Sequence, residues 1–62
     1  MKTIFARCYW ENTERDDHDV EGVLIDVPNN AGADEIEDKM YKHLQNIFGD
    51  NIIMNILYIK VL

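Results

Sequence analysis

Three stretches of the chain are rich in β-branched and aromatic residues, and each predicts a β-strand. They are Lys2–Trp10, Val20–Val27 and Asn51–Leu62. Successive side chains of a strand point to opposite faces, so the first strand has one apolar face made of Ile4, Ala6, Cys8 and Trp10. Pro28 ends the second strand, because proline cannot donate to a ladder. The polar segment Glu11–Asp19 predicts the loop of a hairpin between the first two strands.

A helix is predicted at Asp34–Phe48. Its apolar residues recur at spacings of three and four, which forms one stripe: Ile36, Met40, Leu44 and Ile47. Asp34 is expected as the N-cap, with Glu37 three residues later completing a capping box, and Asn30 is the alternative cap. Gly49 suits the residue of positive φ that closes a helix.

These elements predict a single α+β domain over residues 1–62, in the order β-β-α-β, with one helix on one face of a three-stranded sheet. A right-handed crossover through the helix makes the third strand parallel to the second. If the third strand pairs with the first, the sheet has order 2-1-3 and is antiparallel throughout, which is the topology we expect. A mixed sheet of order 1-2-3 is the alternative.

One helix covers only one face of such a sheet, yet the other face is also apolar. A strand that is apolar on both sides is typical of one buried on both sides, and a bare apolar face usually marks an interaction site. We therefore expect either a homodimer or a protein partner to cover the open face. The residues assigned to it are Phe5, Tyr9, Leu24, Met54, Ile56 and Tyr58. With Arg7 and Lys60, the rings of this face also permit a platform for single-stranded nucleic acid.

Acidic residues are concentrated in the middle of the chain. Eleven of the twelve fall between Glu11 and Asp38, and only Arg15 opposes them within that stretch. They are Glu11, Glu14, Asp16, Asp17, Asp19, Glu21, Asp26, Asp34, Glu35, Glu37 and Asp38. A net charge of −6 disfavours nucleic acid and membranes as partners and favours a basic protein surface. The structural interpretation of these acids is a solvated surface together with the acidic residues that commonly occupy the first turn of a helix.

The functional interpretation is a docking surface for a basic partner, in its strongest form a mimic of the phosphates that a nucleic-acid-handling enzyme binds. In size, acidity and lack of motifs, the chain is similar in type to small phage-encoded inhibitors of host defence. The leading hypothesis is therefore a protein-binding module that acts as an inhibitor or regulator. Its rivals are a structural homodimer and a single-strand nucleic-acid binder.

No motif predicts a reaction, a cofactor or a metal. Adjacent residues such as Asp16, Asp17, His18 and Asp19 rarely converge on one ion. Cys8 could serve as a nucleophile with His18 or His43, but alternation places it under the helix as a core thiol. We expect no enzymatic activity. A lone cysteine, no secretion signal and no apolar run of membrane-spanning length predict a cytoplasmic protein.

Overall fold

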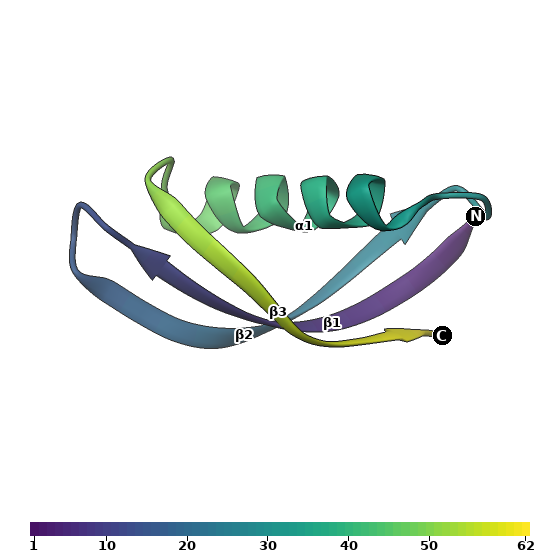
Figure 1. The fold of residues 1–62 in the computed structure, drawn as a ribbon, viewed down its shortest axis with the longest axis horizontal. Helices are drawn as coiled ribbons and strands as arrows, with labels where there is room; N and C mark the ends of the chain where they lie inside the picture. Colours follow the sequence, from purple (N-terminus) through teal and green to yellow (C-terminus); the bar gives the residue numbers. More distant parts are fainter.

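A computed structural model describes residues 1–62 as three strands and one helix (Figure 1). The elements follow in the order β1 (Lys2–Asn12), β2 (Asp17–Val27), α1 (Ala33–Phe48) and β3 (Ile52–Val61). The sheet order is β2-β1-β3, and β1 pairs antiparallel with both neighbours. The expected two-layer α+β fold with its 2-1-3 sheet is therefore confirmed. Because β1 is central, β2 and β3 are both edge strands.

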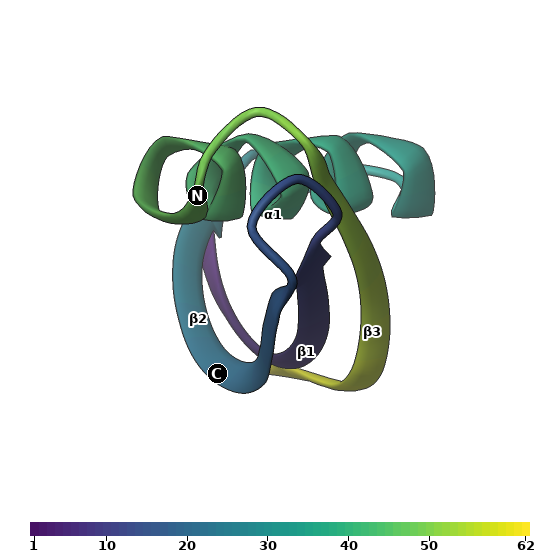
Figure 2. The same ribbon diagram turned by 90° about the vertical axis from the view of Figure 1, so that its left-hand side faces the viewer.

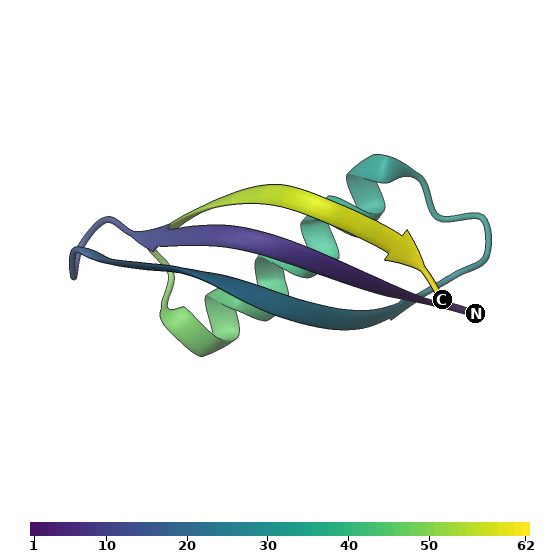
Figure 3. The same cartoon turned by 90° about the horizontal axis from the view of Figure 1, so that it is seen from below.

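The core lies between α1 and the face of the sheet that α1 covers. Figure 3 shows α1 crossing the three strands diagonally, so that it starts beyond β3 and ends beyond β2. The buried apolar residues come from all four elements: Ile4, Ala6, Cys8, Trp10, Val23, Ile25, Val27, Met40, Leu44 and Ile52. The predicted apolar face of β1 is thus the one that the helix covers.

The helix packs through a slightly different stripe from the predicted one. Met40 and Leu44 are buried, but Ile47 is 56% exposed. Phe48 takes its place, because its ring stacks on that of Trp10 with 3.8 Å between centroids. The residues of α1 that pack on the sheet are therefore Met40, Leu44 and Phe48, each four positions after the last.

The helix begins without the predicted capping box. Gly32 is the N-cap, in an extended conformation, and no side chain caps the first turn. The prediction that Asp34 is the N-cap is wrong, because the helix already begins at Ala33. At the other end, Gly49 has a φ of 105°, and its N–H donates to the carbonyl of Gln45. The sequence prediction of a positive-φ residue there is confirmed.

The hairpin between β1 and β2 is tighter than the predicted loop. Pairing continues to Asn12 and Asp17, so only residues 13–16 form the turn. The side chain of Asn12 makes this possible, since its Oδ1 accepts hydrogen bonds from the backbone N–H groups of Glu14 and Arg15. Asp16 completes the turn with a φ of 60°, a conformation that aspartate tolerates better than most residues.

A β-bulge in β3 changes which residues face the helix. Arg7 of β1 pairs with Tyr58, whereas the next residue, Cys8, pairs with Ile56. Leu57 is therefore an extra residue, and side chains before and after it switch faces. The placement of Met54 and Ile56 on the open face is thus wrong. Both lie on the helix side, half-buried against the core, while Tyr58 lies on the open face.

Candidate functional site

Ten of the eleven acidic residues between positions 11 and 38 form two groups, one on the β1–β2 hairpin and one at the start of α1. The chain is elongated, with extents of 36 × 17 × 16 Å, and Figure 1 shows the β1–β2 turn at one end and the start of α1 at the other. We name the first group the hairpin acids: Glu11, Glu14, Asp16, Asp17, Asp19 and Glu21. The second group, the helix-start acids, consists of Asp34, Glu35, Glu37 and Asp38.

Asp26 belongs to neither group and lies near the end of β2, opposite Thr3 of β1. Its carboxylate accepts a hydrogen bond from the hydroxyl of Thr3 at 2.7 Å. The acids already form two clusters in the sequence, residues 11–21 and 34–38, and the structure keeps these clusters apart as two separate surfaces.

Most hairpin acids have hydrogen-bonding or ionic partners within the chain. Glu14 accepts a hydrogen bond from the side chain of Asn51, and Asp17 lies 3.7 Å from Arg15. The hydroxyl of Tyr9 donates to Glu11 at 3.3 Å. Burial, followed by the nearby charge of Glu11 and this hydrogen bond, raises the pKa of Tyr9. These contacts give several of the acids a local structural role.

The helix-start acids have fewer partners. Asp38 forms an ion pair with Lys42 at 3.0 Å, one helical turn away. Asp34, Glu35 and Glu37 form none, and all four acids are exposed. Their carboxylates are therefore free to meet cationic groups from outside.

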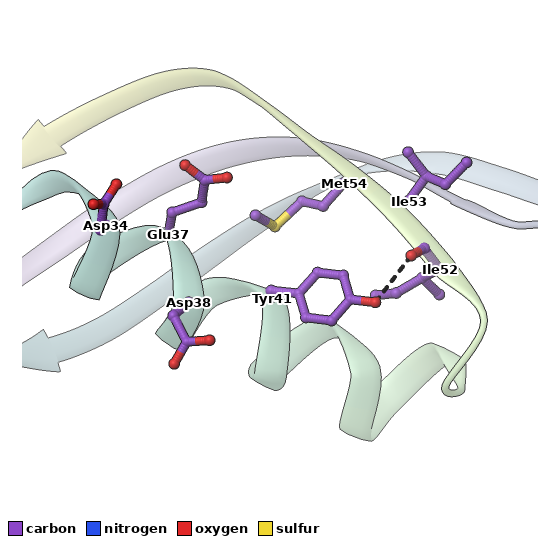
Figure 4. A pocket seen from close by; sticks show the side chains of 7 residues that line it. All are labelled: Asp34, Glu37, Asp38, Tyr41, Ile52, Ile53 and Met54. Atoms are coloured by element: carbon purple, nitrogen blue, oxygen red, sulfur yellow. Dashed lines mark hydrogen bonds between the residues drawn. The ribbon is translucent and has the colours of Figure 1, made fainter.

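Three of these acids line a groove between α1 and the first part of β3. The groove has a volume of about 500 Å³. Its walls are Asp34, Glu37, Asp38, Tyr41, Ile52, Ile53 and Met54. Figure 4 shows the carboxylates on the helix side and the apolar side chains on the strand side. The hydroxyl of Tyr41 donates to the carbonyl of Ile52 at 3.1 Å, which ties the two walls together.

The open face of the sheet carries four of the six predicted interface residues: Phe5, Tyr9, Leu24 and Tyr58. Phe5 and Tyr58 contact each other in a tilted arrangement with 6.4 Å between ring centroids. Tyr58 is 52% exposed and Leu24 is 60% exposed. Large apolar surface therefore remains in water on this face, although it is smaller than expected because the bulge removes Met54 and Ile56 from it.

The charges on the open face are mixed. Arg7 and Lys60 lie among the rings, but Glu11 and Asp26 share the same face by their pairing positions. A site for single-stranded nucleic acid combines stacking rings with a positive groove. The two acids offset the two cations, so the face supplies rings without a net positive charge.

The two edges of the sheet differ sharply, which sequence reasoning missed. At the β2 edge, the backbone N–H of Val20 is bonded to the carboxylate of Asp19 at 2.7 Å. The backbone carbonyl of Asp26 on the same strand accepts from the ammonium of Lys39. Charged side chains on an edge discourage the pairing of another strand. The protein therefore blocks its own β2 edge with side chains.

The β3 edge is open. Leu62 N–H donates to the carbonyl of Thr3, and Thr13 N–H donates to that of Asn51. Directly opposed residues alternate between hydrogen-bonded and non-bonded pairs in an antiparallel ladder, so the backbone groups of every second residue of β3 point away from β1. These residues are Ile52, Met54 and Ile56 before the bulge and Ile59 and Val61 after it. The carbonyl of Ile52 accepts the hydrogen bond from Tyr41, whereas no side chain bonds to the outward backbone groups of the other four. β3 carries no acid and the single cation Lys60.

The residues considered for catalysis or metal binding are kept apart. Cys8 is buried under the helix, and burial raises the pKa of its thiol. His18 lies on the opposite face of the sheet, beside the ring of Tyr9 at 6.3 Å between centroids. His43 is exposed on α1. Because His18 alternates with Asp17 and Asp19, it points to the other face of β2, and no three such side chains form a cluster that could hold a metal ion.

Two further findings concern the chain as a whole. The single helix is neither long nor apolar enough to cross a membrane. Comparison with models of protein families, with curated proteins and with solved structures found no significant match to this chain.

Proposed function

We propose that this protein is a protein-binding module whose partner presents basic groups to the groove between α1 and β3. The observation that carries this proposal is the groove itself. Its helix side is lined by Asp34, Glu37 and Asp38, and its strand side is apolar. Cationic side chains have long aliphatic stems with a charged end, so they match a groove with one acidic wall and one apolar wall.

The helix-start acids differ from the hairpin acids in how many of their carboxylates have partners within the chain. Three of the four helix-start acids have no basic partner within the chain, whereas several hairpin acids accept hydrogen bonds from other groups of the chain. Unpaired carboxylates accelerate encounter with a cationic protein and orient it. If the partner is a nucleic-acid-handling enzyme, occupying its basic surface would make this module an inhibitor or regulator.

The test uses charge reversal at each end. The triple variant Asp34→Lys, Glu37→Lys and Asp38→Lys is compared with Asp16→Lys, Asp17→Lys and Asp19→Lys as the matched control. Each is immobilised and exposed to a lysate of the source organism at low and high salt. We expect wild type and the hairpin variant to retain the same protein, and the groove variant to lose it. An unchanged capture by the groove variant would contradict the proposal.

A homodimer is the second candidate, favoured by the apolar side chains that β3 leaves exposed: Ile53, Leu57, Tyr58, Ile59 and Val61. A domain of this length buries about 60% of its unfolded surface and gains from additional burial. Light scattering over a concentration series separates the two candidates. A stable dimer would favour self-association as the function of the β3 region. A monomer would leave this region available to a different protein.

A further inference from the structure

We infer that β3 accepts an additional strand from the partner, an extended segment in which basic residues alternate with apolar ones. The inference rests on the proposed function and specifies how the same region would bind. Strand addition to an exposed edge obtains affinity from backbone hydrogen bonds, and alternate side-chain positions determine specificity.

The backbone requirement distinguishes β3 from β2. The outward N–H and C=O groups of Met54, Ile59 and Val61 lack partners within the chain, as the ladder pattern shows. At the β2 edge, Asp19 and Lys39 already occupy outward groups of Val20 and Asp26. On β3 only the carbonyl of Ile52 is occupied, by the hydroxyl of Tyr41. An incoming strand would therefore find hydrogen-bonding positions on β3 from Met54 onward and charged side chains on β2.

The side-chain requirement follows from what surrounds the β3 edge. The first turns of α1 extend past β3, as Figures 2 and 3 show from two directions. A strand added beside β3 would lie below these turns, with every second side chain pointing toward them. On that side it would meet the carboxylates of Asp34, Glu37 and Asp38 and the apolar side chain of Met54. Long basic side chains satisfy both, because their stems pack on the strand and their charged ends reach the helix.

The other side chains of the added strand would point to the open face. There they would lie next to exposed apolar groups of β3, Ile53 and Tyr58. Cross-strand pairs of apolar and aromatic residues stabilise neighbouring strands. Apolar residues at these alternate positions would therefore cover the part of the open face that the fold leaves bare. The pattern predicted for the partner is basic on one face and apolar on the other.

The probe is a synthetic peptide of about ten residues, the length of β3, in which lysine alternates with valine. A second peptide has the same composition but carries its lysines in one block and its valines in another. Ile59→Pro removes one outward N–H of β3 without touching the ladder to β1, and edge strands tolerate proline at such positions. Val20→Pro is the matched variant on the β2 edge, and circular dichroism confirms that each variant folds.

We expect wild type and Val20→Pro to bind the alternating peptide, with the block peptide and Ile59→Pro each weaker by about tenfold or more. Amide exchange of the wild-type protein supplies a measurement that needs no variant. The amides of Met54, Ile59 and Val61 should become protected by the alternating peptide, while the outward amides of Val20 and Leu24 on β2 stay as they were.

Three results would overturn strand addition. The first is failure of any alternating peptide to bind or to protect the β3 amides. The second is equal binding by both peptides and by Ile59→Pro, with loss only in the groove-reversal variant, which would leave the proposed function intact as a purely electrostatic contact. The third is a dimer without peptide that Ile59→Pro dissociates, which would assign the edge to a second copy of the chain. The proposed function fails separately if groove reversal has no effect on partner capture.

Discussion

The side-chain amide of Asn12 donates a hydrogen bond to the backbone carbonyl of Phe48, with 2.7 Å between Nδ2 and the oxygen. Asn12 is the only buried polar residue of the chain. Its Nδ2 binds the end of α1, and its Oδ1 accepts from the turn residues Glu14 and Arg15. One side chain therefore joins the hairpin to the helix.

Replacing Asn12 with alanine should lower the free energy of unfolding by about 1–3 kcal/mol, because a buried side chain loses three hydrogen bonds. The carbonyl of Phe48 keeps one donor, the guanidinium of Arg15. Urea denaturation measures the loss. Thr13→Ala is the matched control, since the Thr13 hydroxyl bonds to the carbonyl of Asn51 in an exposed position, and we expect a change of at most about 1 kcal/mol. Equal losses in the two variants would show that the buried contact has no special role.

Gly49→Ala should also be destabilising, by about 1–2 kcal/mol, because a positive φ strains a residue with a Cβ. The φ of Gly49 is 105°, and an added Cβ would lie 3.0 Å from Nδ2 of Asn12. Gly32→Ala is the control, since a Cβ there meets no atom within 4 Å. Its loss should be smaller, at most about 1 kcal/mol, because only the weaker N-cap preference of alanine is involved.

The same substitution in an Asn12→Ala background separates strain from contact. The contact with Nδ2 disappears with the side chain, so Gly49→Ala should cost less than in wild type, and the difference is the coupling between the two sites. Strict additivity of the two losses would mean that backbone strain alone accounts for the effect.

Met54→Glu and Tyr58→Glu should differ in stability, although an uninterrupted strand would place both residues on one face. Met54 packs against the core, so a carboxylate there loses its hydration and should cost about 2 kcal/mol or more. Tyr58 is half exposed, and its substitution in a monomer should cost about 1 kcal/mol or less. Thermal unfolding compares the two. Similar losses would argue against the bulge at Leu57.

Stability should fall in alkaline solution. Burial raises the pKa of the Cys8 thiol in the folded protein above its ordinary value of 9.0. Below that value both states hold the proton. Above it the unfolded chain releases the proton first, so the unfolded state is favoured increasingly until the pH passes the folded pKa.

Urea denaturation from neutral pH to about pH 10 measures this decline. Cys8→Ala should make the profile shallower. The pKa of Tyr9 is raised from an ordinary value of 10.0, so its contribution declines only above about pH 10. Tyr9→Phe should therefore change the profile only where the measurement extends beyond that pH. Parallel profiles for wild type and Cys8→Ala would show that the thiol is not responsible.

The four elements and their order follow from the sequence alone. The sequence favoured the 2-1-3 sheet but left a 1-2-3 sheet open, and the pairing of β3 with β1 in the structure decides between them. Alternation over β1 identified Ile4, Ala6, Cys8 and Trp10 as the buried face, and all four are buried. The spacing of Met40 and Leu44 identified the packed side of the helix. These features depend on local periodicity and on the handedness of the crossover, which a sequence pattern contains directly.

The tertiary structure alone decided the faces of β3, the length of the hairpin and the position of the charges. Residues two positions apart lie on the same face of a strand only while the strand is paired regularly. The extra residue Leu57 interrupts this alternation, so Met54 and Tyr58 lie on opposite faces. β2 runs the length of the molecule, so the acids of the β1–β2 turn and those at the start of α1 lie at opposite ends (Figure 1). Whether a sheet edge is open depends on which distant side chains reach it. Lys39 reaches the edge of β2, and no residue does the same for Ile59.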